Sequence, residues 1–183
     1  MLKRRNNRKI VIRYGQTELD CRRVIVDVLK QTRGGTTWKG PDDEGNRFNW
    51  SEELPLGEWD GIAPGFIVKR IQVDGNGMIT ILFLSYLGMR GLLPECIGSL
   101  TSLTHLDVSH NQLARLPESI RNLASLTNLC VNNNLLVRIP DSVSNLASLT
   151  WLDIRDNPIT SNLTLQNEVI KRFERIGLFL FVN

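Results

Sequence analysis

Leucine-type residues recur at a fixed period in the second half of the chain. Their spacing is L-x-x-L-x-L-x-x-N-x-L, in which Val, Ile or Met can replace a leucine. Successive copies start 24, 23 and 23 residues apart, and in the first copy Leu87 stands where the others have asparagine. One such unit cannot bury its apolar face alone, so the pattern predicts a stack of repeats. The four copies run over residues 79–89, 103–113, 126–136 and 149–159.

Each repeat divides into a strand, a turn and a return limb. The L-x-L part predicts a short strand with its leucines on one face. The asparagine amide suits a turn whose backbone groups need partners, so Asn111, Asn134 and Asn157 are predicted to form a ladder. The return limbs 116–123 and 139–146 carry a proline near their start, which is typical of a short helical segment.

The segments on either side of the repeats have patterns of their own. Residues 163–176 carry apolar side chains at helical spacing, and Gly177 is placed to end that helix before a last strand over 178–182. On the other side, Asp74–Gly77 reads as a hairpin turn between two strands. Further upstream, a helix starting at Thr17 precedes three tryptophans that we predict to be core residues, Trp38, Trp50 and Trp59.

Residues 79–160 resemble leucine-rich repeats with L-P-x-x-I-x-x-L return limbs, as found in plants, protists and bacteria. The motifs N-W at Asn49 and P-L-G-E-W-D-G-I from Pro55 are similar to the N-terminal cap of such proteins. The resemblance implies an α/β fold: a short horseshoe solenoid with a parallel concave sheet and helical caps. The predicted organisation is a basic flexible tail (1–16), an N-terminal cap (17–78), four repeats (79–160) and a C-terminal cap (161–183).

Composition is that of an ordinary globular chain, which excludes wholesale disorder. Of 183 residues, 42% are hydrophobic and 22% charged, and the net charge is +3. Residues 1–16 carry six basic groups and no acid, so the remainder carries 16 basic and 19 acidic groups, or −3. This balance argues against a nucleic-acid-binding body. No apolar run reaches the length of a membrane span.

Cysteine usage and the start of the chain bear on location. The three cysteines match no zinc spacing, and the basic start lacks the apolar segment of a secretion signal. Leu56 and Pro64 lie where the related extracellular plant cap has disulfide cysteines. These features predict reduced thiols and a cytoplasmic protein, with the nucleus as the alternative.

The strand positions between the leucines are predicted to face the concave side and to bind a partner. The first such column is threonine in all four units, which strand propensity explains. The other columns combine aromatic anchors with an excess of aspartate, which favours another protein with a basic patch and an interface of roughly 800 Å² per side. The candidate partner-binding residues are Phe83, Tyr86, His105, Asp107, His110, Asn128, Cys130, Trp151, Asp153, Arg155 and Asp156.

Plainer interpretations compete at some of these positions. Phe83 and Tyr86 adjoin the predicted N-terminal cap and would serve equally well as packing beneath it. Cys130 has no activating base in its own repeat, and the pair His105 and Asp107 fits a surface polar cluster better than a catalytic dyad. The sequence therefore predicts no enzyme, no cofactor, no metal site and no small-molecule substrate.

Three functions fit the sequence. The first is a non-enzymatic protein-interaction module that acts as an adaptor, scaffold or regulator. The second, which the resemblance allows, is a pathogen-type effector or inhibitor that acts on a host protein. The third is binding of nucleic acid or an anionic membrane through the basic tail, with an affinity that falls as salt rises.

Overall fold

The computed structural model describes residues 48–49, 60–63, 66–69, 71–161, 167, 170–173 and 178–182. The predicted tail, the helix from Thr17 and the three cap tryptophans lie outside these residues, so those predictions remain untested. The predicted repeats lie inside them, over 79–160.

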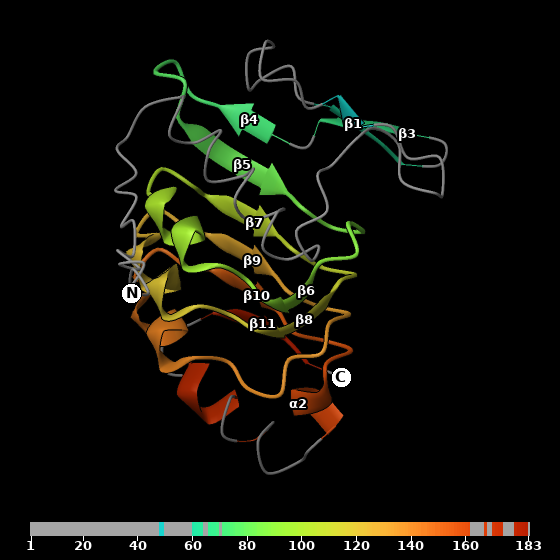
Figure 1. Ribbon diagram of the computed structural model, residues 1–183. Helices are drawn as coiled ribbons and strands as arrows, with labels where there is room; N and C mark the ends of the chain where they lie inside the picture. Colours follow the sequence, from blue (N-terminus) through green and yellow to red (C-terminus); the bar gives the residue numbers. More distant parts are fainter. Residues whose placement is uncertain are drawn as a thin grey trace, which may run out of the picture.

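The repeats form one six-stranded sheet, in which the strands lie one above another (Figure 1). The four inner strands are parallel and come from the four predicted L-x-L segments. At one end β4 pairs with β5 in antiparallel fashion, which confirms the hairpin at Asp74–Gly77. At the other end β11 pairs with β10 in parallel, as the last predicted strand requires. The strands are β4 (Ile71–Val73), β5 (Ile79–Phe83), β7 (His105–Asp107), β9 (Asn128–Cys130), β10 (Trp151–Asp153) and β11 (Phe179–Phe181).

The return limbs of the first three repeats each contain a short 3-10 helix rather than an α-helix. They are η2 (Glu95–Ser99), η3 (Glu118–Asn122) and η4 (Asp141–Asn145). Pro94, Pro117 and Pro140 precede them in extended conformation, with ψ between 148° and 154°. Each proline is thus the residue before the helix, whereas the sequence predicted it in the first turn. Its ring restricts φ, and it has no backbone N–H that would need a partner there.

A second sheet has two strands, each of which follows a strand of the main sheet in the sequence and precedes a 3-10 helix. It pairs β6 (Arg90–Leu92) with β8 (Gln112–Arg115) in parallel. The register shifts between Gly91 and Leu92. Across this shift β6 advances by one residue and β8 by two, from Leu113 to Arg115, so the bulge and its extra residue lie in β8.

The remaining elements flank the repeats in the sequence. A three-stranded antiparallel sheet, which the sequence analysis did not predict, contains β1 (Phe48–Asn49), β2 (Asp60–Ala63) and β3 (Phe66–Lys69). After the last repeat strand comes the short helix α2 (Pro158–Ser161). Residues 170–173 are helical, as predicted for part of 163–176, and Phe173 is fully buried in the core.

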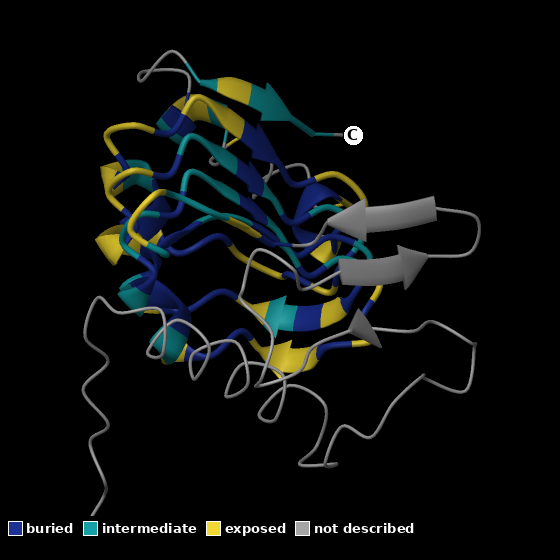
Figure 2. Cartoon of the chain, turned by 90° about the horizontal axis from the view of Figure 1, so that it is seen from above, coloured by how far each residue is buried: buried dark blue, intermediate teal, exposed yellow. Residues whose placement is uncertain are grey.

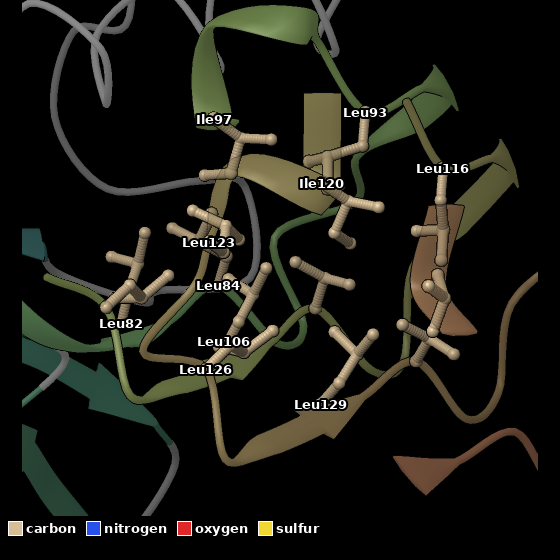
Figure 3. Packing of buried hydrophobic residues seen from close by; sticks show 14 of the residues in the cluster. Leu82, Leu84, Leu93, Ile97, Leu106, Leu116, Ile120, Leu123, Leu126 and Leu129 are labelled. Carbon is tan, nitrogen blue, oxygen red and sulfur yellow. The ribbon is translucent and has the colours of Figure 1, made fainter. Parts of the chain in front are cut away.

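The core fills the coil between the strands and the 3-10 helices. Figure 3 shows Leu106 and Leu129 projecting from the strands toward Ile120 and Leu123 on the opposite limb. Buried residues gather on the inside of the coil in Figure 2, whereas exposed residues lie mainly on its turns and limbs. The apolar positions of the repeat are therefore one continuous core, which explains why the repeats must stack.

The predicted asparagine ladder is present and links each repeat to the one before it. Asn134 accepts the backbone N–H of Leu113 at 2.9 Å and donates to the carbonyl oxygens of Val108 and Val131 at 3.0 Å. Asn157 repeats this pattern one unit later, bonding to the N–H of Leu136. All three ladder asparagines are buried, so these hydrogen bonds replace water for backbone groups that the turn would otherwise strand.

Candidate functional site

The face of the six-stranded sheet that points away from the core is the predicted concave side, which we call the outer sheet face. Strand register brings its side chains into two rows. One row contains Ile81, His105, Asn128, Trp151 and Phe179, and the other contains Phe83, Asp107, Cys130, Asp153 and Phe181. The leucine row between them is buried at Leu82, Leu106, Leu129 and Leu152 and partly buried at Leu180. The predicted strand residues are therefore neighbours on one surface.

An aromatic cluster occupies the β10–β11 end of the outer sheet face. The Trp151 ring lies 4.3 Å from the Phe181 ring and 6.4 Å from the Phe179 ring, centroid to centroid, in tilted arrangements. Phe179 is 68% exposed and Trp151 36%. The sequence analysis did not include Phe179 and Phe181 among the candidate residues. Leu180 pairs with the core residue Leu152, so the alternation of side chains along β11 places its two neighbours on this face.

Asp153 and Arg155 form an ion pair beside this cluster. The guanidinium donates from Nε to Oδ1 at 3.0 Å and from Nη2 to Oδ2 at 2.6 Å. These hydrogen bonds raise the pKa of Arg155, and its charged group also lies 5.5 Å from the centre of the Phe181 ring. Asp153 is only 5% exposed. The sequence predicted an open carboxylate here, whereas the structure neutralises it with a residue two positions away.

Asp107 is the carboxylate that the outer sheet face presents near its centre. Its Oδ1 accepts the backbone N–H of Ser109 at 2.8 Å, and the residue is half-buried. Within the described part of the chain it has no ion-pair partner, in contrast to Asp153. The acidity predicted for this face thus centres on Asp107 and on Asp156 at the edge.

Cys130 lies between Asp107 and Asp153 in the same row. Desolvation by burial, followed by the negative charges of those two aspartates, raises the pKa of its thiol from 9.0 to about 11. A nucleophilic cysteine needs a lowered pKa, because the thiolate is the reactive form. The environment of Cys130 therefore acts against covalent catalysis, chiefly through burial, with a smaller contribution from the carboxylates of Asp107 and Asp153.

One column at the edge of the face has an unusual backbone. Tyr86, His110, Asn133 and Asp156 all have left-handed conformations, with φ between 51° and 59°. Their side chains contact each other between neighbouring repeats. The rings of Tyr86 and His110 are stacked with their centroids 4.2 Å apart, and Nδ2 of Asn133 donates a hydrogen bond to Oδ2 of Asp156 at 3.2 Å. Tyr86 is 61% exposed. Packing of Tyr86 beneath the N-terminal cap, the alternative interpretation from sequence, stays a prediction, because most of that cap lies outside the described residues.

The threonine column is a hydrogen-bonded ladder, which strand propensity alone did not predict. The hydroxyl of Thr104 donates to the carbonyl oxygen of Thr80 at 2.8 Å. Thr127 and Thr150 each donate to the preceding threonine in the same way, at 2.9 and 3.2 Å. Hydroxyls on a β-branched side chain can add such bonds without leaving the strand conformation.

The described residues contain no group of three or more His, Cys, Asp or Glu side chains placed to hold a metal ion. Within the same segments, none of the helices has the length and apolar character needed to cross a membrane. The outer sheet face instead offers an aromatic cluster, a carboxylate and hydrogen-bonding side chains on a rigid sheet. This chemistry suits recognition of another molecule.

Comparison with known proteins agrees with the geometry. A family model described as a leucine-rich repeat region matches residues 71–171. A chain of the BIR3–SERK2 complex of Arabidopsis thaliana is 21% identical, with a TM-score of 0.51 over 74% of this chain and 68% of that one.

A leucine-rich repeat protein of Leptospira interrogans is 26% identical, with a TM-score of 0.45 over 50% of this chain and 25% of that one. The chain thus spans about a quarter of the length of the Leptospira protein. No curated protein matches in sequence. Leucine-rich repeat regions typically mediate protein–protein interaction and are generally non-enzymatic. The matched region covers more than half of the 183 residues, so the chain belongs to the leucine-rich repeat family.

Proposed function

We propose that this chain is a non-enzymatic module that binds another protein through its outer sheet face. The observation that carries the proposal is the aromatic cluster of Trp151, Phe179 and Phe181. Exposed aromatic side chains held on a rigid element are the residues that most often dominate binding energy at interfaces. Here they lie at one end of the face, and the positions level with them on β7 and β9 are His105, Asp107, Asn128 and Cys130.

Charge supports a partner with a basic surface. The outer sheet face and its edge carry three aspartates, Asp107, Asp153 and Asp156, against one arginine, Arg155. With both histidines neutral this gives −3 + 1 = −2. Complementary charge steers association and excludes wrong partners, so a basic partner would dock faster and more selectively. The BIR3–SERK2 complex contains a relative of similar fold in association with another protein, which agrees with a binding role.

The partner can be sought by affinity capture. The full chain is immobilised, incubated with native extract, and the captured proteins are identified by mass spectrometry. Trp151→Ala should weaken a specific partner at least about tenfold, as expected for an interface aromatic. Leu135→Ala is the matched control because Leu135 is 51% exposed but lies outside the outer sheet face. Equal affinity of both variants and the unchanged chain would contradict the proposal.

An adaptor and an inhibitor of another cell's protein would use the same surface, and the extract in which the partner is found distinguishes them. A cytoplasmic location, with the nucleus as the alternative, remains part of the proposal. Cys130 is a free thiol, which is consistent with a reducing compartment. Binding of nucleic acid or an anionic membrane through the basic tail concerns residues 1–16, which lie outside the described residues.

A further inference from the structure

The centre of the outer sheet face presents hydrogen-bond acceptors and no competing cation of its own. Asp107 uses Oδ1 for the N–H of Ser109 and has its other oxygen available for a partner. Arg155, the arginine of this face, is already held by both oxygens of Asp153. A cation that binds Asp107 must therefore come from another molecule.

His105 adds a second acceptor two residues away on the same face. Its Nδ1 lies 2.8 Å from the hydroxyl oxygen of Thr104. That hydroxyl has one proton, and its oxygen is also 2.8 Å from the carbonyl oxygen of Thr80. Both contacts are hydrogen bonds together when the hydroxyl donates to the carbonyl oxygen and Nδ1 carries a proton that it donates to Thr104, and this is the tautomer that we assign. In the neutral ring this leaves Nε2 as an acceptor.

Two acceptors on alternate residues of a strand lie roughly 6.6 Å apart along the backbone. Arginine suits this arrangement because its planar guanidinium has five N–H donors pointing in several directions, and can bond a carboxylate and an imidazole nitrogen together. The ammonium of lysine is a compact point charge and is less able to reach both.

The aromatic cluster lies a fixed distance from these acceptors. Strands β7 and β10 are separated by β9, which places them two spacings, about 10 Å, apart. Trp151 is level with His105 rather than with Asp107, which adds an offset of about 7 Å along the strand. The resulting separation between Asp107 and Trp151 is about 12 Å, which an extended chain covers in roughly four residues.

We propose that the outer sheet face binds an extended segment of its partner that carries an arginine on Asp107 and His105 and a large apolar side chain, about four residues away, on the Trp151 cluster. The inference rests on the proposed function and specifies the chemistry of the partner. Opposite charge at Asp107 and the exposed rings of Trp151 and Phe179 supply the complementarity at the two points.

A random library of 12-residue peptides displayed on phage tests this proposal against the immobilised full chain. Selected peptides should share an arginine and an aromatic or long aliphatic residue about four positions apart. Asp107→Asn should weaken them about tenfold, because it removes a charge-assisted bond while the new amide oxygen can still accept from Ser109. Glu118→Gln removes an equivalent charge on η3, away from this face, and should leave binding unchanged.

Synthetic versions of the leading peptide then test the guanidinium itself. Replacing its arginine with lysine should weaken binding severalfold in the unchanged chain, and His105→Ala should abolish this preference for arginine. Circular dichroism and thermal melting establish that each variant is folded. The inference would be overturned if the selected peptides contained no arginine and Asp107→Asn had no effect on their binding. If Trp151→Ala still abolished binding in that case, the proposed function would stand.

Two other outcomes are also decisive. Peptides that bind every outer-face variant as tightly as the unchanged chain would contradict both this inference and the proposed function. Recovery of no peptide that depends on Trp151 would overturn the extended-segment inference, whereas capture of a folded partner that depends on Trp151 would still support the proposed function.

Discussion

The side-chain oxygen of Asn111 accepts the backbone N–H of Leu87, one repeat earlier, across 3.1 Å. It also accepts from Met89, and its amide nitrogen donates to the carbonyl oxygen of Leu84 at 2.9 Å. Leu87 occupies the ladder position of its own repeat but has no amide. The first repeat can carry a leucine there because the next repeat supplies the hydrogen bonds to its turn.

Replacing a ladder asparagine should be strongly destabilising. Asn134→Ala leaves the N–H of Leu113 and the carbonyl oxygen of Val108 without their side-chain partner in a buried turn. Each buried group left unpaired costs about 1–3 kcal/mol, so the free energy of unfolding should fall by about 3 kcal/mol. Urea denaturation followed by circular dichroism measures this change.

Asn145→Ala is the matched control for the ladder. Asn145 is exposed at the end of η4, so its replacement should change the free energy of unfolding by less than about 0.5 kcal/mol. Equal stability of the two variants would show that water replaces the ladder amide and that the ladder does not hold the repeats together.

Tyr86 offers a test of the left-handed column. Its φ of 59° is unfavourable for a residue with a Cβ atom, and glycine adopts it freely. Both Tyr86→Gly and Tyr86→Ala remove the stack on His110, so their difference reports the backbone alone. The glycine variant should be more stable by about 1 kcal/mol.

The opposite order is expected on an ordinary strand. Gln112, exposed on β8, should favour alanine over glycine by about 0.5–1 kcal/mol. Thermal melting of the four variants measures both differences. If alanine is preferred at both positions, the conformation at Tyr86 is not left-handed in solution.

Gly98 controls the approach of neighbouring 3-10 helices. A Cβ atom there would lie 2.5 Å from the backbone oxygen of Ser119 and 2.7 Å from its Cβ. Gly98→Ala should therefore push η2 and η3 apart and cost about 1–3 kcal/mol, as overpacking does. A Cβ atom at Gly75 would have no other atom within 4 Å, so Gly75→Ala should change the free energy of unfolding little. Urea denaturation compares the two, and equal effects would contradict such close packing.

The repeat period predicted the strands, the ladder and the core because these depend on contacts that recur every 23 or 24 residues. Leu106, Leu129 and Leu152 align in register as their spacing requires. The sheet of β1–β3 was not predicted, because its strands have no shared period to identify them. The return limbs were read as helical, but which helix type forms depends on how closely neighbouring repeats pack.

The candidate site was predictable by position more than by chemistry. Alternation placed His105 and Asp107 on the correct face, but it did not show that Asp153 is buried by Arg155. That ion pair joins residues two positions apart, and the Arg155 guanidinium also lies 5.5 Å from the centre of the Phe181 ring. The role of Phe181 itself depends on the pairing of β11 with β10, which no local pattern specifies.

Cys130 should be a slow nucleophile in the folded protein. With the pKa raised from 9.0 to about 11, the thiolate fraction at pH 8 falls about a hundredfold relative to an ordinary cysteine. Iodoacetamide labelling, quantified by mass spectrometry of the Cys130 peptide, should therefore be slow at pH 8 and accelerate up to about pH 11. The same labelling in urea should proceed at the rate of a normal thiol.

The shift at Cys130 also links folding to pH. Because the folded protein holds this proton more tightly than the unfolded chain, its contribution to stability is complete below about pH 9 and is lost as pH rises toward 11. Asp107→Asn removes one of the charges that raise the pKa, so it should move the labelling profile to lower pH, whereas Glu118→Gln should not move it. An unshifted profile in Asp107→Asn would show that burial alone suppresses the thiolate, and would remove the evidence that Asp107 makes the centre of the outer sheet face electronegative.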